Sequence, residues 1–488
     1  MASPPRTGWL GAIESLGNRL PHPTLLFVWL CLLLLPVSAL LAVIGPQAAH
    51  PVSAEIIQVR SLLSGDGLRW MLTSMVSNFT GFAPLGVVLV AMLGIGLAEQ
   101  SGLLGRMLTA LVRRAPGPLL VPLVALAGVL SSLAADAGYV VLVPLAALLF
   151  RQAGRSPLTG IAVAFAGVSG GFSANLLLGP VDALLAGIST EAARTLDPTA
   201  TVSAAANYWF MLASVALVVG VITLVTARTT DCPTDSAEPE QISADHTPIS
   251  STVLCALAYL TVIALLALPA GAPLRHPETG ALLSSPFMHG IVIIIALGFA
   301  MSGICYGRAS GRFRRASDVI IALETTMAQL AGYLVLMFFA AQFVAWFNWS
   351  GLSLVLAVKG AAALADTGLP APALLIGLVL LVALINLLVG SASAKWALLA
   401  PLLVPMLMLL GVTPEAAQAA FRVGDSATNI ITPLMPYFAL VLGFVRRHDP
   451  AAGIGTLMAM MLPYSLTLLL GWTILLGLWL TLGWPLGL

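Results

Sequence analysis

Three polar side chains lie at helical spacing between Arg422 and Pro436, inside sequence that is otherwise strongly apolar. They are Arg422, Asp425 and Asn429, and Pro433 then removes a backbone hydrogen-bond donor. An ionisable group at mid-bilayer costs roughly 2.5 to 3.5 kcal/mol, and interrupted backbone at that depth persists only where protein or a water-filled cavity satisfies it. The stretch is therefore predicted to line a binding site.

A stretch in the first half of the chain repeats this pattern. GFSANLLLGP at 171–180 and GDSATNIITP at 424–433 both fit Gly-x-Ser-Ala followed nine residues after the Gly by Pro, without a gap. A Leu-Val-Pro string precedes each copy, at 142–144 and 403–405. Helix interruptions at corresponding positions of two halves are typical of the central site of a secondary transporter. The alternative is two unrelated loops between helices.

Oxygen-bearing side chains gather near both interruptions. Hard cations such as Na⁺ take oxygen ligands, and interrupted helices expose carbonyl groups that add to them. In the second half the candidate sodium ligands are Asp425, Ser426, Thr428 and Asn429, with Ser391 and Ser393 of the GSASAKW string. In the first half the candidates are Ser131, Ser132, Asp136, Ser173 and Asn175.

Two further charged residues have alternative interpretations. Asp182 has no basic neighbour in the sequence, and because an apolar setting favours the neutral carboxylic acid, it is a candidate proton carrier. The alternative is a helix-capping or solvated aspartate. Lys395 lies beside Ser391 and Ser393, which fits the serine–lysine nucleophile of an intramembrane hydrolase. Without an evident oxyanion pocket, pairing with a carboxylate or attraction of an anionic substrate is favoured.

The elements that must position these residues are membrane helices. Of 488 residues, 59% are hydrophobic and 8% charged, whereas soluble domains average roughly 25% charged residues. The net charge of +1 says nothing about partners, no basic tract indicates a nucleic-acid partner, and no GxxxxGK[ST] motif indicates ATP binding. The cysteines lack CxxC spacing and predict neither a disulfide framework nor a metal site.

The predicted fold is an all-α polytopic membrane protein of about nine transmembrane helices and two re-entrant hairpins. The segments 118–150 and 372–411 are apolar, and the first is too short for two full spans, which need about 40 residues. The chain then divides into scaffold spans (1–117), a first repeat with hairpin and broken helix (118–226), a polar cytoplasmic linker (227–250), further scaffold spans (251–371) and a second repeat with the last span (372–488).

Charge asymmetry orients this layout. A cytoplasmic N-terminus places most arginines in cytoplasmic segments, among them Arg113, Arg151, Arg308 and Arg446. The positive-inside rule therefore predicts a cytoplasmic N-terminus and an external C-terminus in a bacterial-type inner membrane. The two repeats then enter from opposite faces, as in an inverted-repeat transporter.

Long strings in the chain resemble the AbgT transporters, a family named for uptake of p-aminobenzoyl-glutamate. They are SLGNRLPHPTLLF from Ser15, GGFSANLLLGPVDALLAG, GSASAKWALLAPLLVPM and RVGDSATNIITPLMPYF. The resemblance implies nine spans and two hairpins in a homodimer. It also implies transport of p-aminobenzoyl-glutamate, and for some members export of sulfonamide antimetabolites driven by an ion gradient.

The resemblance also implies a set of substrate-binding residues. They are Asp182, Asn386, Ser393, Trp396, Pro414, Arg422, Asp425 and Pro433. The implied substrate is an aromatic amide with two carboxylates. Trp396 is therefore expected to stack on its aromatic ring, and the planar guanidinium of Arg422 is expected to bind a carboxylate. The alternatives are a packing or interfacial role for Trp396 and a salt bridge between Arg422 and Asp425.

We therefore expect a secondary transporter and not an enzyme, coupled to Na⁺ and/or H⁺, with no cofactor besides the coupling ion. The expected partners are the substrate, membrane lipid and a second copy of the chain. Each hairpin and broken helix is expected to move as one core against the scaffold. Rival interpretations are an ion-coupled carrier of other carboxylates or drugs and a passive channel.

Overall fold

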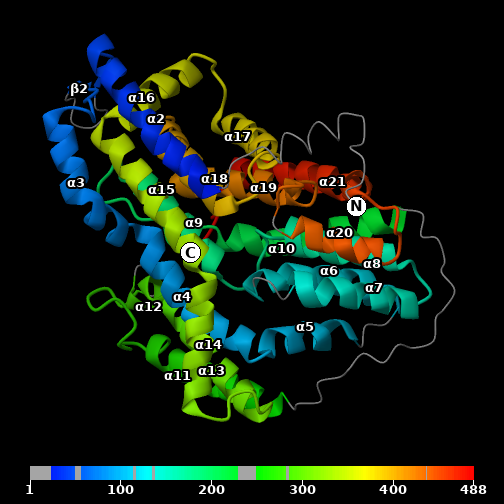
Figure 1. Ribbon diagram of the computed structural model, residues 1–488. Helices are drawn as coiled ribbons and strands as arrows, with labels where there is room; N and C mark the ends of the chain where they lie inside the picture. Colours follow the sequence, from blue (N-terminus) through cyan, green and yellow to red (C-terminus); the bar gives the residue numbers. More distant parts are fainter. Residues whose placement is uncertain are drawn as a thin grey trace.

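The computed structural model describes residues 23–49, 56–113, 117–134, 138–228, 249–281, 285–435 and 437–488. Helices make up nearly all of the regular structure in these ranges, as the composition predicts (Figure 1). The described part of the chain contains seven helical segments long and apolar enough to cross a membrane, together with shorter apolar helices of 10–17 residues. The protein is thus an all-α polytopic membrane protein, and the count of nine spans stays a prediction.

The N-terminal part includes a small antiparallel hairpin of strands that is not among the predicted elements. Gln47 pairs with Gln58 and Ala49 with Ile56. The elements here are α2 (Pro23–Ile44), β1 (Gln47–Ala49), β2 (Ile56–Gln58), α3 (Gly65–Thr80), α4 (Ala83–Gln100) and α5 (Leu103–Arg113).

The segment predicted as the first repeat, 118–226, contains several helices and a helical interruption at 171–179. Its elements are the 3₁₀ turn Gly117–Leu119, α6 (Leu120–Leu130), the 3₁₀ turn Ser131–Ala134, the π-helical turn Gly138–Leu142, α7 (Val143–Gln152), α8 (Pro157–Phe165), the π-helical turn Ala166–Gly170, α9 (Pro180–Ala193) and α10 (Tyr208–Arg228). Helix α8 packs against both α6 and α7. A Cβ on Gly128 of α6 would lie 2.7 Å from the Cα of Gly167, so small residues allow the hairpin to approach the interrupted helix.

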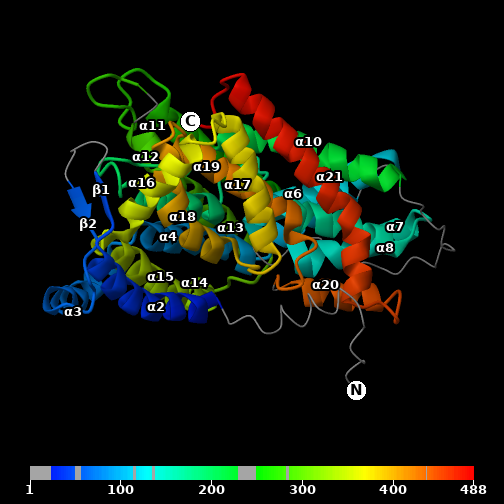
Figure 2. The ribbon, with the colours of Figure 1, turned by 90° about the horizontal axis from the view of Figure 1, so that it is seen from above.

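The middle of the chain supplies helices that surround this region. They are α11 (Ser250–Ala267), α12 (Pro286–His289), α13 (Ile291–Ala309), α14 (Ala316–Gln329), α15 (Ala331–Trp349) and α16 (Leu352–Ala365). In Figures 1 and 2, α11 to α13 lie at one edge of the molecule, and α2 and α3 lie near α15 and α16 at another. Most of the predicted polar linker, 229–248, lies outside the described residues.

The second repeat consists of α17 (Ala371–Asn386), α18 (Ala392–Met408), α19 (Pro414–Asn429), α20 (Phe438–Arg446) and α21 (Ile454–Thr481). Its predicted hairpin tip is shorter than expected, because Ser391 caps α18 by accepting a hydrogen bond from the backbone N–H of Ala394 at 3.4 Å. Ser393, Lys395 and Trp396 therefore lie in the first turns of a helix. Helix α18 packs against α9 of the first repeat, and α17 packs along α19.

The two copies of the repeated string differ in local structure. In the first copy the helix ends at Gly170, and 171–179 are not helical before α9 begins at Pro180. In the second copy α19 continues through Asn429, and the interruption follows between Ile430 and α20. Adjacent glycines at 170 and 171 lower the helix propensity of the first copy. The interruptions therefore occur in both halves, offset by several residues.

Candidate functional site

The interrupted helices of the two halves meet at an ion pair between Asp182 and Arg422. Asp182 lies in the first turn of α9, where its Oδ2 accepts a hydrogen bond from the backbone N–H of Gly179 at 2.6 Å. Its Oδ1 accepts from Nη2 of Arg422 on α19, and the side chains are each 3% exposed. Nη1 of Arg422 contacts the sulfur of Met211 on α10.

This pairing bears on two expectations. Asp182 has no basic neighbour in the sequence, but Arg422 is its partner in space, and its role as a proton carrier stays a prediction. The alternative salt bridge between Arg422 and Asp425 is wrong, because Arg422 pairs with Asp182 of α9 and Asp425 pairs with Lys395 of α18. The helix-capping alternative for Asp182 is confirmed by its bond to Gly179.

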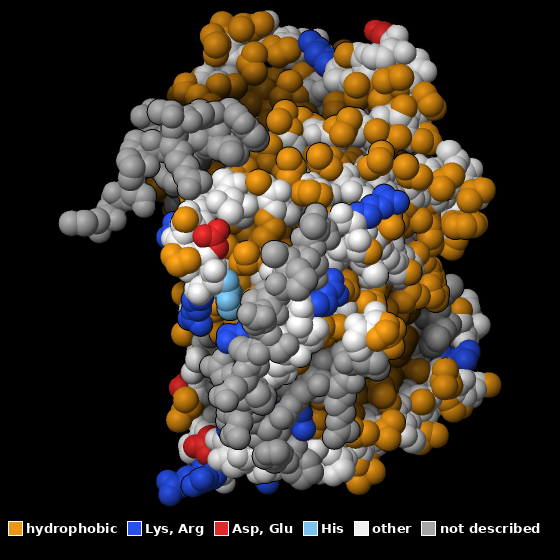
Figure 3. Space-filling view, turned by 90° about the vertical axis from the view of Figure 1, so that its right-hand side faces the viewer, with side chains coloured by type: hydrophobic (Ala, Val, Ile, Leu, Met, Phe, Trp, Pro, Cys, Tyr) orange, Lys and Arg blue, Asp and Glu red, His pale blue; other side chains and the backbone are white. Residues whose placement is uncertain are grey.

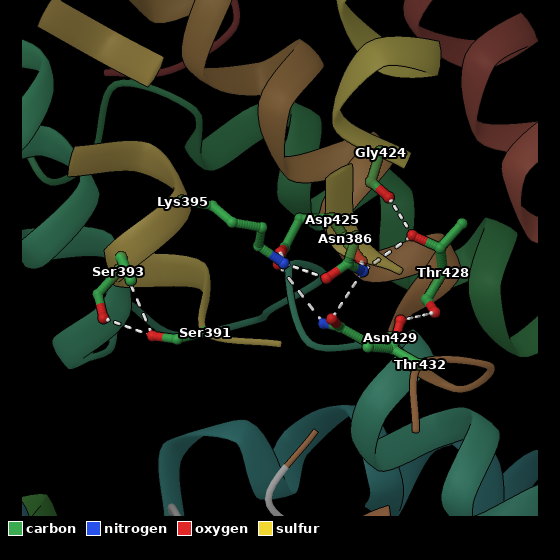
Figure 4. Close-up of polar contacts among 10 residues, drawn as sticks. Asn386, Ser391, Ser393, Lys395, Gly424, Asp425, Thr428, Asn429 and Thr432 are labelled. Carbon is green, nitrogen blue, oxygen red and sulfur yellow. Dashed lines mark hydrogen bonds and ion pairs between the residues drawn. The ribbon is translucent and has the colours of Figure 1, made fainter. Parts of the chain in front are cut away.

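A second buried ion pair joins Lys395 of α18 to Asp425 of α19 (Figure 4). Their side chains are 0% and 1% exposed. The Lys395 ammonium also donates to Oδ1 of Asn386, the last residue of α17. The expectation that Lys395 pairs with a carboxylate is therefore confirmed, and the Lys395–Asn386 contact connects the start of α18 with the end of α17.

Asn386 gathers several oxygen atoms of α19 around its amide nitrogen. Its Nδ2 lies 2.7 Å from the backbone oxygen of Asp425, 2.8 Å from Oγ1 of Thr428 and 2.9 Å from Oδ1 of Asn429 (Figure 4). We refer to Asn386, Asp425, Thr428 and Asn429 as the oxygen cluster. Three of its four members were predicted as sodium ligands, and the fourth was predicted as a substrate-binding residue.

The remaining second-half candidates lie around this cluster. Ser391 and Ser393 share a hydrogen bond of 3.1 Å and lie apart from Asn386 in Figure 4. The hydroxyl of Ser426 is fully buried and has no hydrogen-bond partner among the described residues. Pro414 opens α19 after its N-cap, and Pro433 lies in the interruption beyond it.

The candidate sodium ligands of the first half make fewer contacts with one another than those of the second half. The Ser132 hydroxyl donates to Oδ1 of Asn175 at 2.8 Å, while the hydroxyl of Ser131 donates to the Gly128 carbonyl at 2.6 Å. Ser173 is buried close to the interruption, and Asp136 lies outside the described residues. The structure thus brings Ser132 and Asn175 together but does not show a cation-sized set of oxygen atoms among the described members of this group.

Trp396 is enclosed by protein and does not present a free face. Its side chain is buried, its ring lies 4.6 Å from that of Phe421 at an angle of 33°, and its Nε1 donates to Ser189 at 2.9 Å. The packing alternative therefore describes this arrangement. Ser189 then donates to Gln418 at 2.7 Å, and Gln418 donates to Asn207 at 2.8 Å.

Ser189, Gln418 and Asn207 were missed in the sequence. A signal existed for Gln418, because it lies four residues before Arg422 and therefore on the same side of α19. Ser189 and Asn207 carry no comparable spacing signal. Together the three residues connect α9, α19 and the start of α10 to the tryptophan of α18.

A cavity of about 980 Å³ lies between several helices. Ala183, Ala186 and Thr190 of α9 line it, as do Thr413 and Glu415 at the start of α19. Residues from α4, α13, α17 and the C-terminal segment 483–488 contribute to its wall. Ala183 directly follows Asp182 along α9, but neither Asp182 nor Arg422 is among the residues that line the cavity.

Comparison with known proteins agrees with this architecture. The profile of the AbgT transporter family matches residues 8–488. The chain belongs to this family. It is 37% identical to the p-aminobenzoyl-glutamate transport protein of Escherichia coli (strain K12), over 98% of this chain and 95% of the relative.

Two solved structures resemble this AbgT transporter closely. The Alcanivorax borkumensis YdaH transporter superposes with a TM-score of 0.92 at 61% identity, covering 96% of this chain and all of the other. MtrF of Neisseria gonorrhoeae, described as illuminating a class of antimetabolite efflux pumps, superposes with a TM-score of 0.90 at 45% identity, covering 97% of each chain. The resemblance seen in the sequence is thus confirmed.

The AbgT transporter is not an enzyme, and its geometry agrees. A serine–lysine nucleophile requires the lysine nitrogen beside the serine hydroxyl. Here the Lys395 ammonium is directed to Asp425 and Asn386, while Ser391 and Ser393 bond to each other (Figure 4). The hydrolase alternative therefore lacks the contact on which it depends.

Replacing Trp396 of the AbgT transporter by phenylalanine is expected to lower the free energy of unfolding by about 1 kcal/mol, because one hydrogen bond is lost while an aromatic ring remains against Phe421. Replacing it by alanine is expected to cost about 3 to 5 kcal/mol, because a large cavity is left. Thermal unfolding of the purified variants in detergent measures the difference. Equal losses in both variants would show that the hydrogen bond, and not the ring, dominates.

Proposed function

We propose that this chain is an ion-coupled secondary transporter of p-aminobenzoyl-glutamate or related aromatic anions. The observation that carries the proposal is the pair of buried ion pairs, Asp182–Arg422 and Lys395–Asp425, at the meeting point of two interrupted helices. Buried charges inside a membrane protein are costly and mark transport pathways. Sulfonamide export, which the description of MtrF as an antimetabolite pump suggests, is included in the proposal.

The anionic substrate requires both donors and a counter-charge. Arg422 keeps its Nε without a hydrogen-bond partner among the described residues, although its side chain is 3% exposed. An unsatisfied buried donor costs about 1 to 3 kcal/mol or more when charged, so a ligand oxygen that satisfies it gains affinity. Asp182, Asn386, Ser393, Trp396, Pro414, Asp425 and Pro433 are proposed to complete the substrate site.

The coupling ion is proposed to be Na⁺ at the oxygen cluster, or H⁺ carried by Asp182. Carboxylate and amide oxygens are the ligands that a hard cation prefers, and Asp425 supplies the charge. One charge moved through 100 mV is worth about 2.3 kcal/mol, enough for roughly fiftyfold accumulation. A carrier of other carboxylates or drugs remains the second candidate, because the geometry of Arg422 suits any carboxylate.

The proposed orientation of the protein in the membrane is based on the positions of its arginines. Arg151 lies in the last turn of α7 and Arg155 in the turn that follows, while Arg446 is the last residue of α20 and Arg447 follows it. Both ends lie at the right-hand side of Figure 1, and the space-filling view of that side shows Lys and Arg side chains scattered among apolar ones (Figure 3). Burial and the charges of Arg151 and Arg447 lower the pKa of His448 there. This side is proposed to face the cytoplasm, so that the cavity beside α9 opens outward.

The hairpins and interrupted helices are proposed to move as one core against the remaining spans, in a homodimer within the inner membrane. The hydrogen bonds from Trp396 through Ser189 and Gln418 support a common core, because they join α18, α9 and α19. Crosslinking the core to α4 should then stop transport and spare substrate binding. Unimpaired transport after crosslinking would contradict a moving core.

Uptake of radiolabelled p-aminobenzoyl-glutamate into proteoliposomes is expected under one imposed gradient, of sodium or of protons. Asp182→Ala and Asp425→Ala are expected to abolish it, because each leaves a buried cation without its partner. Asp66→Ala is the matched control, since the side chain of Asp66 is 83% exposed. Uptake without gradient dependence would indicate a passive channel. No uptake with intact sulfonamide efflux would indicate a drug exporter.

A further inference from the structure

The Lys395 ammonium lies beside the oxygen cluster and contacts two of its oxygen atoms. Its side chain is fully buried, and its two polar contacts are Oδ1 of Asp425 and Oδ1 of Asn386 (Figure 4). The amide nitrogen of Asn386 is directed to oxygen atoms of α19. In that orientation the Asn386 carbonyl oxygen accepts from the ammonium. The two oxygen atoms that a metal cation would need, Oδ1 of Asp425 and Oδ1 of Asn386, therefore already contact a positive charge.

A metal cation and the ammonium cannot share these atoms. Two positive charges within a few ångströms repel strongly where water does not screen them. Asp425 carries one negative charge and Lys395 one positive charge, and Asp182 and Arg422 balance each other likewise. An added cation would therefore leave one uncompensated positive charge in a buried site unless an anion entered with it.

We propose that Lys395 is a tethered competitor of the coupling cation at Asp425, and that binding of Na⁺ releases its ammonium to pair with a carboxylate of the substrate. The inference rests on the proposed function and adds a role for Lys395 to it. Two buried polar groups near Asp425 along α19 have no hydrogen-bond partner among the described residues, which supports a ligand in this region. They are the hydroxyl of Ser426 and the Nε of Arg422.

The proposal makes sodium and the anionic substrate cooperative. Sodium frees the ammonium that binds the carboxylate, and the carboxylate holds the ammonium away from Asp425. Because linkage is reciprocal, the substrate must raise the affinity for sodium by the same factor by which sodium raises the affinity for the substrate. A transporter built in this way would bind its ion and its anion together.

Lys395→Met tests the competition. The chain has two lysines, and Lys359 is exposed, so Lys359→Met is the matched control. Thermal unfolding of the purified protein would be followed while NaCl replaces choline chloride at constant ionic strength. The sodium concentration for half-maximal stabilisation is expected to fall by about tenfold or more in Lys395→Met, because the competing charge is gone, and to stay unchanged in Lys359→Met. An unchanged or higher concentration in Lys395→Met would overturn the proposal.

The substrate provides the second readout. In the wild-type protein p-aminobenzoyl-glutamate is expected to lower the half-stabilising sodium concentration, and this effect is expected to disappear in Lys395→Met. Lys395→Met/Asp425→Asn removes both charges and is expected to be stable without sodium and insensitive to it. Persistence of the substrate effect in folded Lys395→Met would contradict release of the ammonium.

A measurement on the wild-type protein covers the case in which Lys395→Met does not fold. Sodium is expected to increase modification of Lys395 by a water-soluble amine reagent, while modification of Lys359 stays constant, as peptide mass spectrometry would show. No increase at Lys395 would overturn the proposal. If uptake proves to be sodium-driven and these results are negative, only the role of Lys395 fails. If the wild-type protein neither takes up substrate under a gradient nor binds sodium, the proposed function fails as well.

Discussion

Arg422→Gln is expected to abolish uptake and to destabilise the protein by about 3 to 5 kcal/mol, the usual cost of leaving one member of a buried ion pair without its partner. The partner here is Asp182, which is 2% exposed and has its second oxygen on the backbone N–H of Gly179. Uptake into proteoliposomes and thermal unfolding in detergent measure the two effects.

A double variant separates the two effects. Asp182→Asn/Arg422→Gln removes both charges, and it is expected to recover most of the lost stability without recovering uptake. Arg69→Gln serves as the control, because the Arg69 and Asp66 side chains are 76% and 83% exposed and an exposed pair contributes little. Full uptake by Arg422→Gln would show that the ion pair is only structural.

Gly424→Ala is expected to remove uptake with a large loss of stability, because α17 and α19 approach each other closely at Gly424. A Cβ on Gly424 would collide with the carbonyl oxygen of Val379 and would lie 2.9 Å from the Cβ of Val382. The helices would have to separate, and Asn386, at the end of α17, would lose its contacts with α19. Overpacking of this kind costs about 1 to 3 kcal/mol.

Gly377→Ala is the matched control for this variant. Gly377 lies in the interior of α17, and nothing lies within 4 Å of the position that a Cβ would take. Alanine is favoured over glycine in a helix by about 1 kcal/mol, so this variant should be as stable as the wild-type protein or slightly more so. Thermal unfolding of both variants under the same conditions provides the comparison. Equal behaviour would refute the argument from close packing.

Those features of the fold that depend on local sequence could be predicted. Pro180 begins a helix after an interruption and Pro433 lies inside one, because proline cannot donate the backbone hydrogen bond that a continuous helix needs. The segment 118–150 forms paired helices with a break between them, as its length required. The pairing of Lys395 with a carboxylate also followed, because a buried ammonium needs a counter-charge.

The partners of the buried charges could not be predicted in the same way. Spacing shows which residues share the face of one helix, but Asp182 and Arg422 are separated by 240 positions and meet only because α9 and α19 cross. The strand pairing of Gln47 with Gln58 could not be predicted for the same reason, because it depends on two separate segments of the chain. Trp396 illustrates a further limit, since an aromatic side chain that packs against Phe421 has the same sequence signature as one that faces a cavity.

The separation between Asp182 and Arg422 has a consequence for biosynthesis. Ribosomes add about 5 to 20 residues per second, so the 240 positions between them take roughly 12 to 48 s to synthesise. During that time α9 either enters the membrane or stays at its surface. In both cases the Asp182 carboxylate lacks the Arg422 guanidinium that later pairs with it. The nascent first half is therefore an incomplete folding unit, and its insertion is finished only when the second half arrives from the ribosome.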